Sequence, residues 1–373
     1  MTSEVKKVLV IGGGFSGMVA AICLQQRGVA VDLVEIDKDW RTYGAGISLH
    51  GATYRLLGQL GLMEAYHKIG GTCDGVHMRG PQDQILAQIP TPPLGPNLPG
   101  NGAVMRPALA KILAEKVRAE GVEVRLGVTF ANIDQHSGDV EFTDGTADTY
   151  DLIVGADGFA SAVRAALYAD APAPQYVGQA VWRALVPRPA EIPTLTMWMG
   201  PKLKAGINHV SDSQSYLFLT EDKPVNEWVS DEALLPEIKA LLAKFPSPVL
   251  TRLAEGLSED SKINYRPLEN MMLPRPWSRG RVVLIGDAVH ATTPHMAAGA
   301  LLGMEDGLVL AEAVASNDAR DAALAAFEER RYERCRMVVE NSARLAEIEV
   351  TGGDHAEHVQ LMGKTQGALA QPI

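Results

Sequence analysis

The sequence predicts an α/β fold in which an antiparallel sheet is inserted into a discontinuous parallel-sheet domain, followed by a C-terminal helix. Three observations predict this fold. Residues 6–37 read as strand, glycine turn, helix and strand, which is one right-handed βαβ unit. From about residue 174 the chain changes to proline-punctuated alternating stretches that are typical of an antiparallel sheet. "RVVLIGDA" (281–288) then returns to a buried strand of the parallel type.

The elements follow one another with clear start and stop signals. "KKVLVI" is a Val- and Ile-rich strand, "GGGFSG" a turn, "MVAAICLQQRG" a helix and "VAVDLVEID" a second strand. Further helices are expected at 53–68, 106–121, 231–256 and about 301–349, and short strands at 122–126, 140–142 and 152–154. The stretch 81–100 contains six prolines, so we expect it to be a connection without regular structure.

Composition limits the classes of function. The 373 residues carry a net charge of −11, which disfavours a nucleic-acid partner. The three cysteines are scattered, a pattern expected of a reducing cytoplasm and not of a zinc–thiolate site. Neither a signal peptide nor a membrane span is recognisable. We therefore expect a cytoplasmic, soluble protein without a metal site, and we expect His355 and His358 to lie in a solvated tail.

The first glycine turn carries a dinucleotide fingerprint. Gly12, Gly14 and Gly17 form G-x-G-x-x-G directly after a strand and at the start of a helix, with Phe15 and Ser16 between them. Such glycines allow a tight turn and close approach of the backbone to a pyrophosphate, which the helix N-terminus attracts. Glu35, at the end of the second strand, is placed to accept hydrogen bonds from ribose hydroxyls. This pattern favours FAD or NAD over NADP at this site.

Two further strands end in Gly/Asp motifs. "DLIVGADGFASAVR" (151–164) places Asp157 between two glycines, and "RVVLIGDAVH" places Asp287 after Gly286. One NAD site does not need two additional strand-end motifs. An extended FAD has three regions to hold, namely adenosine, the pyrophosphate–ribityl chain and isoalloxazine. The combination therefore favours FAD.

These three motifs, in this order, resemble those of the single-component FAD-dependent aromatic hydroxylases, the p-hydroxybenzoate hydroxylase-like family. The resemblance covers nearly the whole chain, and "PHMA" and "MEDG" place it near the salicylate, urate and 6-hydroxynicotinate hydroxylases. It implies a Rossmann-like FAD-binding domain and a monooxygenase that uses NADH or NADPH and O2. Its expected substrate is a small phenolic or N-heteroaromatic compound, with or without a ring carboxylate, hydroxylated through a flavin C4a-hydroperoxide.

The resemblance also implies which residues hold the cofactor. Asp287 would bind ribityl hydroxyls, Asp157 would support the pyrophosphate region, and Arg106 would contact the ribityl–phosphate chain. Where relatives carry Gly-Gln-Gly after the proline, this chain has small residues at 297–300, which puts any glutamine-dependent contact in doubt. The full set of expected cofactor contacts is Gly12, Gly14, Phe15, Ser16, Gly17, Glu35, Arg41, Arg106, Asp157, Gly286, Asp287, Pro294, Ala298, Gly299 and Ala300.

Activation of a substrate hydroxyl calls for a base or an imidazole nearby. The expected catalytic residues are His295, which follows Pro294, His50, and His209 with Tyr216 on the antiparallel sheet. His209, Tyr216 and His295 are also expected to contact substrate, and Arg183 either pairs with a substrate carboxylate or forms a structural ion pair. His290 is expected to support the local backbone.

The domain boundaries and two alternatives complete these expectations. We assign 1–75, 100–173 and 275–340 to the FAD-binding domain, 76–99 and 174–274 to the substrate domain, and 341–373 to a C-terminal helical tail, without the additional domain of larger phenol hydroxylases. The protein is expected to be a monomer or homodimer. The alternatives are a hydroxylase of larger, non-aromatic or drug-like substrates of the tetracycline-inactivating type, and a flavin-binding redox protein without oxygenation.

Overall fold

A six-stranded sheet forms the first half of the molecule. The structure, a computed structural model, describes residues 4–42 and 44–373. The sheet has the order β18-β19-β12-β1-β2-β8, and all neighbours are parallel except β18 and β19. Its strands are β1 (Lys7–Ile11), β2 (Ala30–Glu35), β8 (Glu123–Leu126), β12 (Leu152–Gly155), β18 (Ser278–Arg279) and β19 (Val282–Leu284). The parallel pairing of β1 with β2 confirms the βαβ unit.

Helices and two small sheets surround this sheet. Helix α1 packs against α4 and α9, and α9 packs in turn against α10. The helices are α1 (Phe15–Gln26), α2 (Gly51–Gln59), α3 (Met63–His67), α4 (Arg106–Ala119), α5 (Ala162–Leu167), α8 (Asp287–His290), α9 (Gly299–Ser316), α10 (Arg320–Thr351) and α11 (His355–Ala370). The small sheets contain β3 (Gly46–His50), β7 (Asn101–Met105) and β4 (Gly70–Cys73), and β11 (Ala147–Thr149), β10 (Asp139–Phe142) and β9 (Phe130–Ile133).

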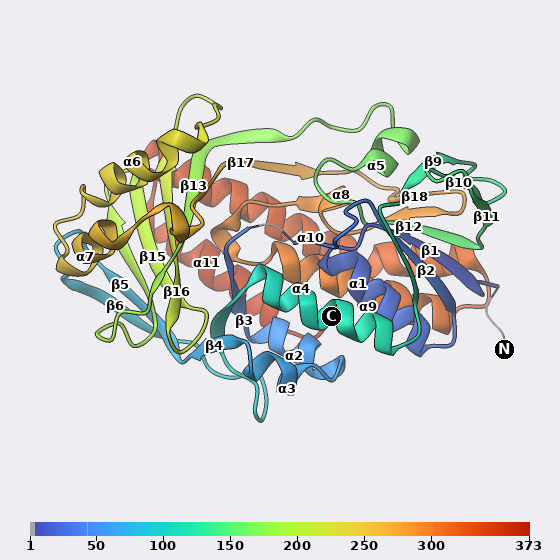
Figure 1. Ribbon diagram of the computed structural model, residues 1–373, viewed down its shortest axis with the longest axis horizontal. Coiled ribbons are helices and arrows are strands. Elements are labelled where there is room, and N and C mark those ends of the chain that lie inside the picture. The colour runs from blue at the N-terminus through green and yellow to red at the C-terminus, as the bar shows by residue number, and fades with distance from the viewer. Residues whose placement is uncertain (1–3, 43) are drawn as a thin grey trace.

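A seven-stranded sheet forms the second half, at the left of Figure 1, and α10 runs from the parallel sheet to it. Its order is β17-β13-β16-β15-β14-β5-β6, antiparallel except for β14 and β5. The strands are β5 (Gly75–Arg79), β6 (Ile85–Pro90), β13 (Gln175–Pro187), β14 (Leu195–Gly200), β15 (Leu203–His209), β16 (Gln214–Asp222) and β17 (Asn264–Met272). Helices α6 (Asp231–Leu242) and α7 (Pro248–Gly256) share its core, in which Trp182 and Trp198 are fully buried. The predicted fold class is confirmed.

Several predicted boundaries were wrong for local reasons. Residues 53–68 are two helices, separated by left-handed Gly61, and 231–256 are also two helices, because Pro246 and Pro248 interrupt them and Ser247 caps α7. The proline-rich stretch 81–100 contains β6, which pairs with β5 and ends at Pro90. The expected helix at 301–349 is divided into α9 and α10, and α10 continues past the boundary drawn at 340. None of the described helices is long and apolar enough to cross a membrane.

Candidate flavin and substrate site

The glycine turn between β1 and α1 is shaped by close backbone packing. Gly12 has a φ of +107°, and a Cβ there would lie 2.4 Å from the Ala156 carbonyl oxygen. A Cβ on Gly17 would lie 2.0 Å from the Gly12 carbonyl oxygen. By contrast, a Cβ on Gly14 would meet no described atom within 4 Å, so this side of the turn is open. Helix α1 starts after Gly14 without a side-chain cap, which leaves its first N–H groups available for an anion such as a pyrophosphate.

Glu35 is fixed at the end of β2 by two backbone amides. Its Oε2 accepts a hydrogen bond from the Gly13 N–H at 2.7 Å, and its Oε1 accepts one from the Asp37 N–H at 2.8 Å. Each carboxylate oxygen has a second lone pair for a ligand hydroxyl. Arg41, another expected cofactor contact, is exposed and lies within ion-pair distance of Asp37 and Asp39.

Asp157 holds the start of helix α5, which Ser161 caps, with both of its oxygens. Oδ1 accepts from the Ser161 hydroxyl at 2.5 Å, and Oδ2 accepts from the Val163 N–H at 3.0 Å. Arg164, on the same helix, donates to the carbonyl oxygens of Phe159 and Ala288 at 2.7 and 2.9 Å. The second motif is thereby joined to the third. Sequence reasoning missed this function of Arg164, because its partner Ala288 lies 124 residues away.

The third glycine motif contacts the first where Gly286 and Gly303 pack against Ser16. Gly286 has a φ of +64°, and a Cβ there would lie 2.3 Å from Ser16 Oγ. A Cβ on Gly303 of α9 would lie 2.1 Å from the same oxygen. Asp287 is exposed and has no hydrogen-bond partner among the described residues. Protein atoms around its carboxylate partly desolvate that group and raise its pKa, whereas His290 and Arg106 act in the opposite direction.

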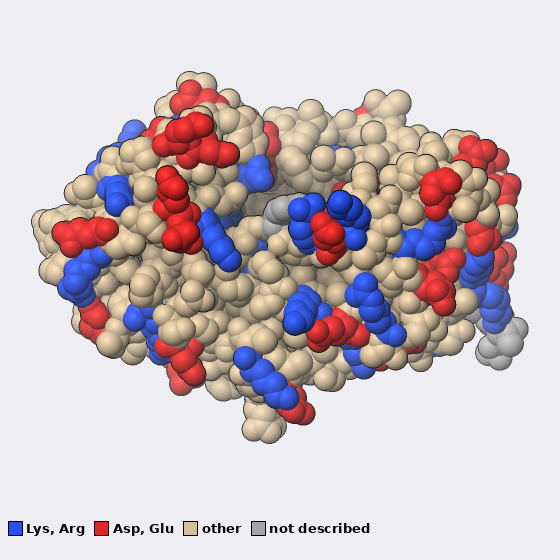
Figure 2. Space-filling model, viewed as in Figure 1, with Lys and Arg blue, Asp and Glu red and all other residues tan. Residues whose placement is uncertain are grey.

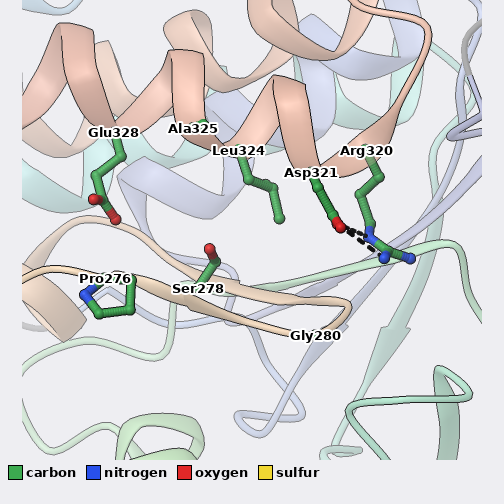
Figure 3. Close-up of a pocket in the computed structure, with 8 residues that line it drawn as sticks. All are labelled: Pro276, Ser278, Gly280, Arg320, Asp321, Leu324, Ala325 and Glu328. Carbon is green, nitrogen blue, oxygen red and sulfur yellow. Dashed lines mark hydrogen bonds and ion pairs between the residues drawn. The ribbon is translucent and has the colours of Figure 1, made fainter.

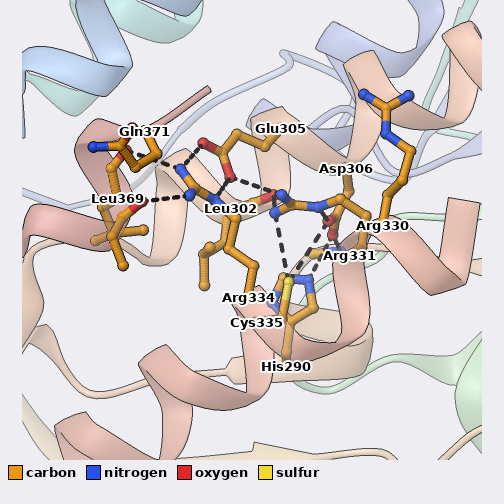
Figure 4. A network of polar contacts seen from close by, with 12 residues as sticks. His290, Leu302, Glu305, Asp306, Arg330, Arg331, Arg334, Cys335, Leu369 and Gln371 are labelled. Carbon is orange, nitrogen blue, oxygen red and sulfur yellow. Dashed lines mark hydrogen bonds and ion pairs between the residues drawn. The ribbon is translucent and has the colours of Figure 1, made fainter. Parts of the chain in front are cut away.

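A buried ion network supports this third turn (Figure 4). Asp306 Oδ2 accepts from the Gly286 N–H at 2.9 Å and from His290 Nε2 at 2.5 Å, and its Oδ1 accepts from Arg331 Nε at 2.7 Å. Arg331 also pairs with Glu305, which in turn pairs with Arg334. Burial would raise the Asp306 pKa, but His290 and Arg331 lower it to about 2. The ionised Asp306 therefore holds the turn from which Asp287 projects.

His290, Asp306 and Cys335 could in principle hold a metal ion, because their ligand atoms lie within 4.8 Å of one another. The guanidinium of Arg331 already neutralises Asp306 and donates to Cys335 Sγ at 3.5 Å. Burial alone would lower the His290 pKa, yet Cys335 and Asp306 raise it well above its ordinary value. A further cation would meet two positive groups here, so the cluster is better suited to bracing the fold.

Arg183 and Tyr216 form a polar pair on the seven-stranded sheet. Arg183 Nε donates to Tyr216 Oη at 2.9 Å, so the Tyr216 O–H itself remains free to donate. Arg106, at the start of α4, lies within electrostatic range: its pKa is lowered by burial and by Arg183, while Tyr216 and Asp287 act to raise it. Among the described residues, no carboxylate lies within ion-pair distance of Arg106 or Arg183. The structural ion pair considered for Arg183 is thus not formed with any described residue.

An apolar cluster surrounds this pair. Tyr216 stacks at a tilt on Phe218, with ring centroids 5.4 Å apart, and a Cβ on Gly46 would lie 2.6 Å from the Tyr216 side chain. The cluster contains Ala45, Ala103, Val210 and Tyr216, with Met105, Leu185 and Phe218 partly buried against it. Figure 2 shows a hollow at the middle of this view with Lys and Arg side chains on both sides.

The three histidines expected to activate the substrate, His50, His209 and His295, are all partly or fully enclosed by protein. His209 is buried, with Nδ1 at 2.8 Å from Ser215 Oγ and Nε2 at 2.7 Å from the Ile192 carbonyl oxygen. Because protein atoms use both ring nitrogens, the expected contact of His209 with substrate is corrected to a structural position. His50 Nε2 is buried and has no partner among the described residues, and burial lowers the His50 pKa to about 4.

His295 belongs to a second buried network. Its Nδ1 lies 2.8 Å from Thr293 Oγ1, and its Nε2 lies 3.0 Å from Gln179 Oε1 and 3.3 Å from Glu349 Oε2. Glu349 also accepts from Lys204 Nζ at 2.6 Å and from His358 Nε2 at 2.9 Å. Since its side chain is only 3% exposed, His295 has no ring nitrogen left for a substrate, contrary to expectation. The expectation of a solvated tail is wrong for His358, which lies on α11 packed against α10, whereas His355 is exposed as expected.

The small residues after Pro294 lead directly into α9. Pro294–Met296 form a short 3-10 helix, Ala297 has a left-handed φ of +51°, and Ala298 precedes α9 without a side-chain cap. The first N–H groups of this 18-residue helix are consequently available at its positive end.

A separate surface pocket lies between α10 and the β18 turn (Figure 3). Its charged groups already have partners: Arg320 pairs with Asp321, and Glu328 accepts from the Trp277 N–H at 2.6 Å. The lining residues are Pro276, Ser278, Gly280, Arg320, Asp321, Leu324, Ala325 and Glu328. None of these residues belongs to the three glycine motifs.

The fold and the three converging glycine motifs define an FAD-binding flavoprotein. Residues 5–342 match the model of the FAD binding domain family. The chain belongs to this family, and it is an FAD-dependent monooxygenase, as the resemblance implied. The open face at Gly14, the uncapped α1 and an Asp287 that no described residue pairs with suit a negatively charged, hydroxyl-bearing cofactor such as FAD.

Similar proteins have related activities. The FAD-dependent urate hydroxylase of Klebsiella pneumoniae is 27% identical over 95% of this chain and 92% of its own. The 6-hydroxynicotinate 3-monooxygenase of Pseudomonas fluorescens is 29% identical over 90% of each chain. The crystal structure of Klebsiella pneumoniae HpxO complexed with FAD and uric acid superimposes with a TM-score of 0.83 at 26% identity, covering 98% of this chain and 93% of that one.

Proposed function

We propose that the chain hydroxylates a small, negatively charged phenolic or N-heteroaromatic compound, using NADH or NADPH and O2. The observation that carries this proposal is the Arg183–Tyr216 pair, which faces Arg106 without a carboxylate partner in the described chain. Because the guanidinium of Arg183 has no acidic partner among the described residues, it favours an anionic ligand. The apolar cluster around Tyr216 suits a flat ring.

Each part of the proposed reaction has a residue to support it. The first turn of α1 and Arg106 would hold the FAD pyrophosphate and ribityl chain, and Asp287 would accept from ribityl hydroxyls. When bound, FAD supplies the transfer of electrons from a nicotinamide and the activation of O2. The N-terminus of α9 would stabilise negative charge on the reduced cofactor.

On the substrate side, we assign positioning to Arg183 and proton donation to Tyr216. Arg183 would pair with an anionic substituent of the substrate. Because Tyr216 Oη accepts from Arg183, its hydroxyl proton can be directed to a substrate oxygen, where it would stabilise a phenolate. Phe218 and Leu185 would exclude water from the ring. We assign to His295 the positioning of the 294–300 segment instead of a catalytic role. The substrate domain, at 76–99 and 174–274, would determine the substrate specificity.

The test is substrate-stimulated oxidation of NADH and of NADPH by the yellow holoprotein, with product analysis. The panel pairs hydroxybenzoates and hydroxypyridine carboxylates with the matching carboxamides. We expect turnover of an acid but not of its amide, and Arg183→Met should raise KM at least 10-fold. Tyr216→Phe should lower kcat about 10- to 100-fold with a smaller change in KM. Absence of stimulation by every aromatic acid would instead favour a redox flavoprotein without oxygenation.

A further inference from the structure

Trp40 contacts the glycine turn of the FAD site directly. It lies in the connection between β2 and β3, and its indole Nε1 donates a hydrogen bond to the Gly13 carbonyl oxygen at 2.8 Å. Trp40 lies 27 residues after Gly13, so this hydrogen bond connects the segment that follows β2 to the turn between β1 and α1. Gly13 occupies a variable position of the G-x-G-x-x-G pattern, so the pattern alone does not predict this hydrogen bond.

Gly13 is held on both sides by side chains. Its N–H donates to Glu35 Oε2 at 2.7 Å, while its carbonyl accepts from Trp40. A Cβ on Gly13 would lie 2.4 Å from Trp40 Nε1 and 3.1 Å from Glu35 Oε2. Gly13 is not among the residues with positive φ, so its need for glycine comes from the indole and not from the backbone conformation. The clamp fixes the orientation of the peptide groups next to Gly14.

The position of Trp40 is itself constrained. Its φ is +50°, in the left-handed region that a bulky residue rarely adopts, and its N–H donates to the Asp37 carbonyl oxygen at 3.1 Å. The guanidinium of Arg118, on α4, lies 4.7 Å from the centroid of the indole ring. Backbone strain of this kind is retained where the surroundings enforce it, often at ligand sites.

We propose that Trp40 is a positioning residue that sets the shape of the pyrophosphate turn, and thereby the affinity for FAD, with Arg118 holding its indole in place. Without the indole N–H, the Gly13 carbonyl loses its partner and the peptide groups beside Gly14 can rotate. The turn then has to be ordered by FAD itself, which weakens binding. Once FAD is bound, the turn is ordered again, so the rate at saturating FAD is retained.

The primary experiment compares Trp40→Phe with the wild-type holoprotein. Phe keeps an aromatic ring under Arg118 but cannot donate to Gly13. The dissociation constant is obtained by diluting holoprotein and measuring free FAD by its fluorescence after ultrafiltration. We expect about a 5- to 10-fold weaker affinity, the effect of one lost hydrogen bond. Trp228→Phe is the matched control, because Trp228 is 66% exposed and lies under Arg266, away from the turn.

A second variant tests the geometry independently. Gly13→Ala should weaken FAD binding in the wild-type chain, because its Cβ meets the indole, and it should do so less in a Trp40→Ala background, where that space is free. kcat at saturating FAD should stay within 2-fold of wild type in Trp40→Phe. The proposal is overturned if Trp40→Phe lowers the urea midpoint but leaves the FAD dissociation constant unchanged, or if the effects of Gly13→Ala and Trp40→Ala are additive.

Discussion

Replacement of Asp306 by Asn should weaken both the fold and FAD binding. The amide has nearly the shape of the carboxylate, but one oxygen becomes an NH2 group. One side of Asp306 faces Arg331 Nε at 2.7 Å, and the other faces the Gly286 N–H and His290 Nε2 at 2.9 and 2.5 Å. In either orientation the NH2 group therefore opposes a buried donor, and the negative charge between Arg331 and His290 is lost.

The expected magnitude follows from the burial of this network. Arg331, His290 and Asp306 are fully buried, and breaking a buried ion pair by removing one partner costs about 3–5 kcal/mol. Urea unfolding at saturating FAD should show a loss in this range, a large part of a typical stability of about 5–15 kcal/mol. The FAD dissociation constant should also rise, because the Gly286 amide is released and the Asp287 turn loses its support.

Asp321→Asn is the control for this experiment. Asp321 lies at the start of α10 with 81% of its side chain exposed, and it pairs only with its neighbour Arg320 among the described residues. Exposed pairs of this kind contribute little, so its urea midpoint should match wild type. If Asp306→Asn unfolded and bound FAD like wild type, the argument that the buried network holds the third glycine turn would be refuted.

Three further predictions concern buried polar groups outside this network. Burial lowers the His50 pKa to about 4, so the unfolded chain takes up a proton below pH 6.5 before the folded protein does. The free energy of unfolding should therefore fall between pH 6.5 and 4, by up to about 1.4 kcal/mol per pH unit. Urea titrations of His50→Asn should show a smaller loss over this window. His209→Phe should cost about 2–4 kcal/mol, because Ser215 and Ile192 lose their partners, while KM and kcat of the folded enzyme stay within 2-fold; a selective loss of kcat would return His209 to catalysis. Glu349→Gln should lower the free energy of unfolding by about 2–4 kcal/mol, because Lys204 loses its ion-pair partner. The double variant with Lys204→Met should lose less than the sum of the two single variants. If the two losses simply add, the pair is not coupled.

The cofactor motifs could be predicted from sequence because their signals are local. A glycine turn between a strand and a helix is recognisable within a few residues, and Glu35 and Asp287 mark the ends of strands. The meeting of Ser16, Gly286 and Gly303 could not be predicted in the same way. It depends on how α1, α9 and the β19 end pack in three dimensions.

The roles of the histidines were harder to predict, because a histidine is defined by its partners. His209 is satisfied by a carbonyl 17 residues earlier, and His295 by Gln179, 116 residues away. Neither partner has a sequence signal. His358 was expected in solvent because no motif accompanies it, yet it reaches Glu349 once α11 folds back on α10. Proline count also misled at β6, since Ile85–Pro90 pairs with β5 and the remaining prolines lie outside the strand.

Helix α10 has a mechanical consequence for how substrate enters. Its Arg331 pairs with Asp306, which holds the Gly286 turn. Its Glu349, 18 residues later, pairs with Lys204 of the seven-stranded sheet. At 1.5 Å per residue these two attachment points are about 27 Å apart on one continuous helix. Such a strut resists bending between the two halves of the molecule. Opening of the site is therefore expected to come from loop movement and not from a hinge between the two sheets.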